Sequence, residues 1–344
     1  MTDASLPSSA SPSSPAPASL SSAAAHRPHF KSHNYTGLKP GPRLVVLGAV
    51  HGNETCGTLA IQRVLVDIDA GRLAIVSGSV TFVPITNPLA YARGERVGDR
   101  NLNRNLTPTA QPVDFEDHIG AWLCPLLAQH EVLLDLHSTR AKNPPFAMLG
   151  PEDNSGSLQP FVHAAKERAL AKRLGVGRFV DGWLETYALG VERRVRAARE
   201  GVKLNPHNTD PRYGVGTTEY MRSVGGYAIT LECGSHDDPA APDVGYRAIL
   251  NTLAFLGISE SAAPAEATQY EALRMFEVID KAHEGDSFSR EWASFDALRK
   301  GELIGTRHDG TPVVAETDGR ILFPDAKATP GHEWFYLTKP ISAI

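Results

Sequence analysis

Apolar runs with the character of buried strands alternate with helical patterns between residues 43 and 258, and this alternation restricts the possible folds more than any other feature. The strand-like runs are short and apolar, whereas the helical patterns repeat their apolar residues at helical spacing. The strand-like runs are residues 43–50, 78–88, 131–137 and 227–234, and the helical patterns are residues 57–71, 115–130 and 243–258. Strands that alternate with helices predict an α/β fold, with a mostly parallel central sheet and helices on both faces.

The two ends of the chain differ from this central region. Residues 1–30 form a tail of mostly Ser, Ala and Pro, which cannot bury enough apolar surface to offset its ordering entropy and is expected to be disordered. The tail lacks the positive start and continuous apolar centre of a secretory signal, so a cytoplasmic location is expected. Residues 261–344 carry short alternating runs separated by Gly, Asp-Gly and Pro, and they predict a small β-rich C-terminal domain after a catalytic domain of residues 31–260.

Composition argues against several classes of protein. A net charge of −5 and a pI of about 6.2 provide no basic surface for nucleic acid. The sequence has no run of about 18 apolar residues, so no membrane partner is expected. Three scattered cysteines without a CxxC pair argue against a disulfide framework and for a reducing compartment. The sequence leaves the oligomeric state open, and a homo-oligomer is one of the options.

Two of the strand ends carry residues that suit a metal. His51 and Glu54 stand three apart just after residues 43–50, and His137 ends residues 131–137, 83 positions after Glu54. Ligands of parallel sheets collect outside the carboxyl ends of the strands. Imidazole nitrogens and a carboxylate oxygen bind zinc, and a catalytic zinc site has three protein ligands and one open position. We therefore expect one Zn²⁺ per chain at these three residues. The ordinary alternative is that each histidine is a hydrogen-bonding loop residue, because short motifs often match by chance.

A third strand end carries an acidic residue, Glu232. Burial of a carboxylate beside an apolar run is costly unless the group is paired or used. Beside a metal, such a carboxylate can take a proton from an activated water molecule and pass it to a leaving amine. Two alternatives stay open. Glu232 could be a structural carboxylate that caps a loop, or Cys233 could act as a thiol nucleophile with the nearby His236.

Residues 94–105 (GERVGDRNLNRN) form a polar loop with three arginines and three asparagines. A solvated loop is the ordinary interpretation of such a composition. Arginine, however, binds carboxylates through two parallel hydrogen bonds, and asparagine offers oriented donors. Arg96 and Arg104 lie eight apart, so one can serve the scissile carbonyl while the other anchors the substrate.

Four motifs in this order, HGNE, NLNRN, DLHST and LECG, resemble those of the succinylglutamate desuccinylase and aspartoacylase family of zinc carboxypeptidase-like hydrolases. Each motif is weak alone, but four in order, each at a predicted strand end or polar loop, form a specific signal. The resemblance spans residues 42–258, and the C-terminal region also resembles that of family members.

The resemblance implies a role for each matched residue. It places zinc on His51, Glu54 and His137 and a general base at Glu232. It further implies that Arg96 polarises the scissile carbonyl, that Asn103 and Arg104 bind a substrate carboxylate, and that Arg222 contacts an acidic substrate side chain.

The chain also departs from the family pattern. Aspartoacylases close the pocket with a tyrosine of the C-terminal domain. Here the segment GHEWFYL offers Tyr336, but its position beside Trp334 and Phe335 favours packing in a core. Residues 186–216 have no counterpart in the family pattern. Their arginines resemble an exposed helical face; they are Arg193, Arg194, Arg196 and Arg199.

Three functional hypotheses follow from these residues. The first is zinc-dependent hydrolysis of the amide bond of a small N-acyl amino acid, which releases a carboxylate and the amino acid. The second is a metallocarboxypeptidase that acts on short peptides. The third is a non-catalytic binding protein with the C-terminal region as a carrier module. Carriers need a lysine at an exposed hairpin turn, and the expected turn at Asp318-Gly319 has none.

Overall fold

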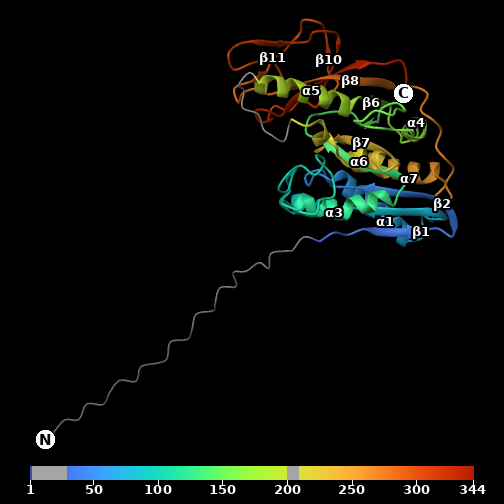
Figure 1. Ribbon diagram of the computed structural model, residues 1–344. Helices are drawn as coiled ribbons and strands as arrows, with labels where there is room; N and C mark the ends of the chain where they lie inside the picture. The colour runs from blue at the N-terminus through green and yellow to red at the C-terminus, as the bar shows by residue number, and fades with distance from the viewer. Residues whose placement is uncertain (2–28, 200–208) are drawn as a thin grey trace.

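The computed structural model describes Met1, residues 29–199 and residues 209–344 (Figure 1). Most of the N-terminal tail that the sequence predicts to be disordered, residues 1–30, therefore lies outside the described residues. Within the described part, no helix is both long and apolar enough to cross a membrane.

A sheet of 11 strands runs through the molecule in the order β1-β3-β2-β4-β7-β5-β6-β8-β14-β13-β10. Its strands are β1 (His33–Thr36), β2 (Lys39–Leu47), β3 (Ser77–Val83), β4 (Val132–Thr139), β5 (Phe146–Met148), β6 (Arg178–Asp181), β7 (Tyr227–Ser235), β8 (Glu271–Asp280), β10 (Ala297–Leu298), β13 (Gly319–Leu322) and β14 (Glu333–Pro340). The neighbours β3, β2, β4 and β7 are all parallel. The predicted α/β fold with a mostly parallel central sheet is confirmed.

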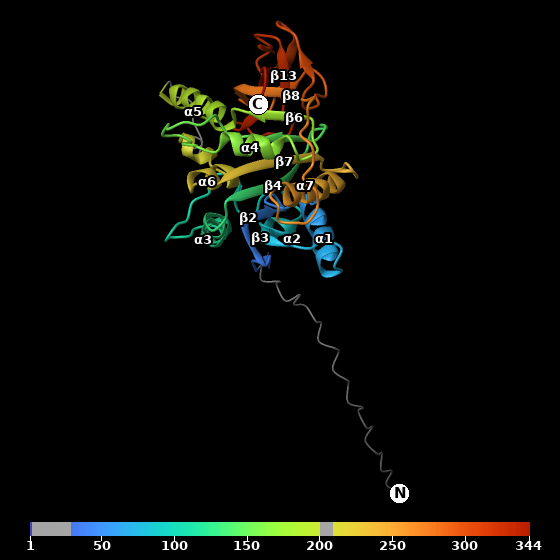
Figure 2. The same ribbon diagram turned by 90° about the vertical axis from the view of Figure 1, so that its right-hand side faces the viewer.

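Helices cover both faces of this sheet. They are α1 (Cys56–Asp69), α2 (Pro88–Arg93), α3 (Phe115–Ala128), α4 (Ala164–Ala171), α5 (Trp183–Arg199), α6 (Thr217–Ser223) and α7 (Ala241–Phe255). Alternate residues of β2 point to opposite faces, so Leu44 and Val46 pack in one core with α1 and α7, while Val45 and Leu47 pack in another with α3 and α6. Figure 2 shows α3 and α6 on one side of the strands and α1 and α7 on the other.

The C-terminal strands continue the same sheet. β8 pairs in parallel with β6, and β14, β13 and β10 follow as antiparallel neighbours. A separate three-stranded sheet of β9 (Ser287–Phe288), β11 (Leu303–Thr306) and β12 (Pro312–Val314) lies beyond them. Its core contains Trp334 and Phe335. The hydrogen-bonded sheet thus crosses residue 260, where the sequence predicts a domain boundary, and the boundary stays a prediction.

One prediction for α5 is wrong. Arg193, Arg196 and Arg199 are exposed, as expected, but Arg194 is only 5% exposed. Arg194 shares a helix face with Tyr187 and Val191, and α5 turns this face toward β8, where both carboxylate oxygens of Asp280 accept hydrogen bonds from Arg194 at 2.8 and 2.7 Å. Part of the same predicted segment, residues 200–208, lies outside the described residues.

Candidate metal centre and active site

The carboxyl ends of β2, β4 and β7 meet at one edge of the sheet. Because these strands are parallel neighbours, the turn after β2 lies beside the end of β4, and His137 of β4 is the register partner of Glu232 in β7. The turn from β2 to α1 carries His51 and Glu54, and the Glu54 N–H donates to the His51 carbonyl at 3.2 Å. The edge where the sequence predicts a site therefore does hold its candidate residues together.

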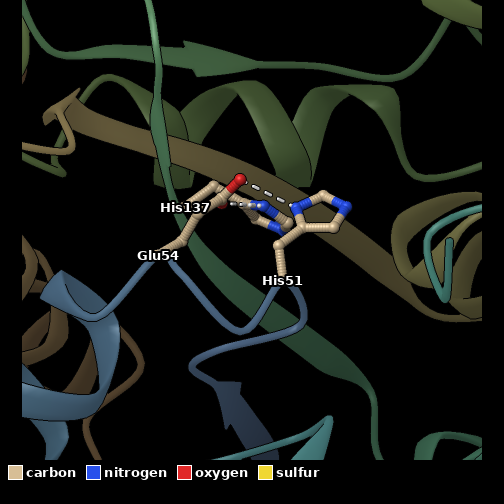
Figure 3. Close-up of side chains that lie close together, drawn as sticks. All are labelled: His51, Glu54 and His137. Atoms are coloured by element: carbon tan, nitrogen blue, oxygen red, sulfur yellow. Dashed lines mark hydrogen bonds and ion pairs between the residues drawn. The ribbon is translucent and has the colours of Figure 1, made fainter. Parts of the chain in front are cut away.

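His51, Glu54 and His137 converge in this edge, and all three are buried (Figure 3). One potential ligand atom from each lies within 4.8 Å of the others. Glu54 lies between the imidazoles: Oε1 is 2.9 Å from His51 Nδ1, and Oε2 is 2.8 Å from His137 Nδ1. The Ser138 N–H also donates to Oε2, at 3.2 Å. Two nitrogens and a carboxylate oxygen in one buried cluster form a donor set that suits zinc.

The second nitrogen of His51 contacts Asn101. His51 Nε2 lies 3.0 Å from Asn101 Oδ1, and the same oxygen accepts the backbone N–H of Asn103 at 2.9 Å. A backbone N–H can only donate, so this contact fixes the amide oxygen, not the amide nitrogen, toward His51. A neutral His51, which its lowered pKa favours, then carries its proton on Nε2 and directs the lone pair of Nδ1 at the cluster.

The second nitrogen of His137 lies beside another buried carboxylate. His137 Nε2 is 3.0 Å from Asp135 Oδ2, and Asp135 also accepts a hydrogen bond from Thr217 of α6. Burial disfavours charge on His137, but Asp135 and Glu54 together raise its pKa well above the usual value. By contrast, burial and the charge of Arg96 lower the pKa of His51 to about 4. The sequence analysis missed both Asn101 and Asp135, although Asp135 lies two positions before His137 and therefore on the same side of a strand.

Glu232 completes the buried acidic group at the edge. Its Oε2 has no hydrogen-bond partner among the described residues. Burial raises the pKa of Glu232 to about 8, against the attraction of His137. The neighbouring Cys233 is fully buried, and a hydrogen bond with Cys56 and burial raise the pKa of its thiol well above the usual value. These surroundings disfavour Cys233 as a nucleophile, because a thiol must ionise to attack.

The polar loop brings its predicted residues to the same place. Arg96 donates to Glu54 Oε1 at 2.7 Å with its side chain 44% exposed. Asn103 Oδ1 accepts the N–H of Thr217 at 2.9 Å. The Arg104 guanidinium lies over the Trp183 ring, 4.6 Å from its centroid. These three side chains are thus held at the site, although residues 94–96 of the loop stay exposed.

Arg222 and Tyr336 have different surroundings. Arg222 is buried, with Nε 2.9 Å from Glu167 Oε2, Nη1 3.5 Å from Glu219 and Nη2 2.6 Å from the Ala228 carbonyl. Tyr336 is also buried, and its hydroxyl has no hydrogen-bond partner within the described ranges. Both side chains reach the wall of a cavity of about 540 Å³ that also contains the three predicted ligands, Glu232, Arg96, Asn103 and Arg104.

An α/β sheet with a buried His–Glu–His cluster at the carboxyl edge of its parallel strands has the arrangement of a candidate metal-dependent enzyme site. The resemblance that the motifs predict is supported by comparison, because residues 40–167 match the catalytic domain of the succinylglutamate desuccinylase/aspartoacylase family. A succinylglutamate desuccinylase of Shewanella amazonensis is 24% identical over 307 residues, which cover 86% of this chain and 82% of the relative.

Solved structures of similar fold carry related names. A succinylglutamate desuccinylase/aspartoacylase from Rhodobacter sphaeroides superposes with a TM-score of 0.66 at 18% identity, covering 91% of this chain and 89% of that one. The product-bound ectoine utilization protein EutE (DoeB) from Ruegeria pomeroyi superposes with a TM-score of 0.65 at 17% identity, covering 90% and 88%. At these identities the likeness concerns the fold.

Proposed function

We propose that the protein is a zinc-dependent amidohydrolase that cleaves the amide bond of small N-acyl amino acids. His51, Glu54 and His137 would hold one zinc ion per chain. The support comes from the match of residues 40–167 to the family's catalytic domain, from the donor set and from the cavity that joins these residues to Glu232 and the polar loop.

One observation carries the metal assignment. The Nε2 proton of His51 is committed to Asn101, so the Nδ1 lone pair faces a Glu54 oxygen at 2.9 Å. Two electron-rich atoms at this distance repel each other unless a cation serves both. Asp135 and Glu232 add two more buried carboxylates, and buried charges are normally paired or bound to a metal. The residues present therefore fit a divalent cation.

A zinc ion with these ligands would lower the pKa of a bound water toward about 7 and polarise a carbonyl oxygen. The charge of such an ion would also lower the pKa of Glu232, which would keep this carboxylate ionised. Glu232 then accepts a proton from the attacking water on its free oxygen and passes it to the amine nitrogen that leaves. Arg96 donates to the carbonyl oxygen as charge develops there, a contribution that is typically about 3–4 kcal/mol.

The remaining predicted residues orient the substrate. Arg104 and Asn103 would hold a carboxylate of the N-acyl amino acid. Arg222 is predicted from the family to contact an acidic side chain. Its guanidinium already bonds to Glu167, Glu219 and a backbone carbonyl, so in this role it would have to give up one of these partners.

The decisive experiment is Glu232→Gln in the zinc-loaded protein. Loss of a general base typically costs 10²–10⁴-fold in rate, so hydrolysis of N-acetyl amino acids should fall by about that much. Zinc content, measured by atomic absorption, should stay near that of the wild type because Glu232 is not a ligand. Glu260→Gln, a change at an exposed position, is the matched control. Unimpaired hydrolysis by Glu232→Gln would refute the proposed mechanism.

The predicted alternative is a metallocarboxypeptidase for short peptides, which would need a cavity that admits a peptide chain. Several residues between Phe323 and Tyr336 of the C-terminal region line the cavity along with the catalytic edge, and this arrangement favours a small substrate. Dipeptides assayed beside N-acetyl and N-succinyl amino acids separate the two activities.

A further inference from the structure

The cavity has an apolar wall that the proposed reaction does not use. We define this wall as Met148, Trp183 and Phe323. All three line the cavity. Each is only partly buried, and each packs against a core that includes Tyr336, Phe295 and Leu273. Part of the surface that this core leaves uncovered lines the cavity.

The apolar wall lies close to the predicted general base. In the pairing of β5 with β7, Phe146 is opposite Glu232 and Met148 is opposite Thr230. Two residues along a strand span about 7 Å, so Met148 stands about that far along the sheet from Glu232. Tyr336 packs between the other two members of the wall. The centre of its ring lies 5.5 Å from that of Trp183 and 6.3 Å from that of Phe323. A substrate group one or two bonds from the scissile amide can reach this wall.

Most cationic side chains around the cavity already have carboxylate partners. Arg96 pairs with Glu54 at 2.7 Å, Arg140 with Asp325 at 3.2 Å, and Arg222 with Glu167 at 2.9 Å. Arg104 has no carboxylate at ion-pair distance in the part of the chain that the structure describes. Lys327 also lines the cavity but is exposed. Arg104 is therefore the arginine of the cavity wall that is best placed to bind a substrate carboxylate.

Arg104 and the apolar wall are in direct contact, since the guanidinium lies 4.6 Å from the centre of the Trp183 ring. The carboxylate and the side chain of an amino acid are attached to the same carbon atom. A carboxylate held by Arg104 therefore directs the amino-acid side chain toward Trp183. A second carboxylate at that position would lose its water against an apolar surface without gaining a partner, which is costly.

On the basis of the proposed function, we infer that the preferred substrates are N-acyl derivatives of aromatic or large aliphatic amino acids, rather than of aspartate or glutamate. The apolar wall binds the side chain, and Arg104 binds the single carboxylate.

The test compares kcat/KM of the zinc-loaded protein for N-acetyl-L-phenylalanine, N-acetyl-L-leucine, N-acetyl-L-aspartate and N-acetyl-L-glutamate, with N-acetylglycine as reference. Burial of a large apolar group typically changes kcat/KM by 10-fold or more. The two apolar substrates should therefore exceed N-acetylglycine by at least about 10-fold, and the two acidic substrates should not exceed it. Equal rates, or a preference for an acidic substrate, would overturn the inference and favour the family-derived role of Arg222.

Variants locate the preference on the wall. Trp183→Ala and Phe323→Ala should each reduce the phenylalanine-to-glycine ratio of kcat/KM by about 10-fold. Leu189→Ala is the matched control, because it lies on the same helix as Trp183 but is 47% exposed and should keep the wild-type ratio. An unchanged ratio in both wall variants would contradict the role of the wall. Circular dichroism establishes that each variant is folded.

Binding separates this inference from the proposed reaction. If no N-acyl amino acid is hydrolysed, the proposed function fails, and calorimetric titration with N-acetyl-L-phenylalanine and N-acetyl-L-aspartate still tests the wall. Tighter binding of the phenylalanine derivative by about 10-fold supports the inference. Equal or reversed affinities reject it.

Discussion

Asn101 determines which nitrogen of His51 is available to a metal. Its amide oxygen accepts from both His51 Nε2 and the Asn103 backbone. Partners of this kind orient the ligand histidine and fix its tautomer, and their removal typically costs 10–100-fold in metal affinity. The residue thus contributes to the site without touching the substrate.

Asn101→Leu should weaken zinc binding by about 10–100-fold, because the larger apolar side chain offers no acceptor for the Nε2 proton. Asn101→Asp keeps an acceptor at the same place and should bind zinc within a few-fold of the wild type. Competition with a chromophoric chelator measures both affinities. Equal affinities for the leucine variant and the wild type would show that the contact does not orient His51.

At the residue scale, the sequence predicts site residues where they stand together in a short motif at the end of an apolar run. His51, Glu54, His137 and Glu232 stand at strand ends that apolar runs mark clearly, and the structure brings all four together. Arg222 shows the opposite case. Its partners Glu167 and Ala228 come from other elements, and nothing in the local sequence indicates that they bind it.

At the scale of elements, α5 shows how a helix can bury a charged side chain. The sequence places four arginines on this helix. Which of them is buried depends on the helix face that packs against a strand, and the sequence does not identify that strand. Asp280 at the end of β8 binds Arg194 through both oxygens, and Glu333 lies 3.7 Å from the same guanidinium. Position 194 is buried because α5 packs on β8, a long-range contact that helical spacing cannot predict.

Arg194→Ala should lower the free energy of unfolding by about 2–3 kcal/mol. The change removes a buried ion pair and leaves Asp280 without its main partner, although Asp280 is partly exposed and can regain some hydration. Urea denaturation measures the loss. Arg196→Ala, on the exposed side of the same helix, should change stability by less than about 0.5 kcal/mol. Similar losses in the two variants would mean that the Asp280 pair is not the cause.

The predicted strands and helices differ in how well the sequence defines them. The apolar runs at 131–137 and 227–234 correspond to β4 and β7, because a strand buried on both faces has to be apolar throughout. β5, in contrast, has only three residues and runs antiparallel to β7. So short a segment has no periodicity to detect, yet it carries Met148 to the cavity.

For the molecule as a whole, pH should act on stability through Asp286, which joins the loop after β8 to the strand pair β11–β12. Its carboxylate is fully buried. Burial opposes ionisation, but the Arg307 guanidinium and the backbone N–H groups of Ala282, His308 and His283 outweigh it and lower the pKa of Asp286 to about 2. The ordinary value is 3.8. Ionised Asp286 therefore stabilises the folded protein above about pH 4, and this contribution is lost as the pH falls toward 2.

Asp286→Asn should lower the free energy of unfolding at pH 7 by about 2 kcal/mol, which is the free-energy equivalent of that pKa difference. The difference in free energy of unfolding between the variant and the wild type should then decrease as the pH falls from about 4. Urea denaturation at a series of pH values measures both effects, with Glu316→Gln, an exposed residue of the same region, as control. A gap that stays constant down to the lowest pH would rule out the carboxylate as its source.

The order of strands in the sheet is the part of the architecture that the sequence does not reveal. The alternation of strands and helices predicts a parallel sheet, and the sheet is there. The sequence break near residue 260 is equally visible, but composition does not tell that β8 hydrogen-bonds to β6. Pairing between strands so far apart depends on the whole folded chain.

The pairing of β8 with β6 has a consequence for any attempt to shorten the protein. A chain that stops at residue 260 would leave β6 as an open edge, with a row of unpaired backbone donors and acceptors that can recruit a second copy. It would also lose Phe323 and Tyr336 from the cavity. The last quarter of the chain therefore covers the edge of β6 as well as forming part of the pocket, and we expect that trimming the protein to its motif-bearing region would lower its solubility.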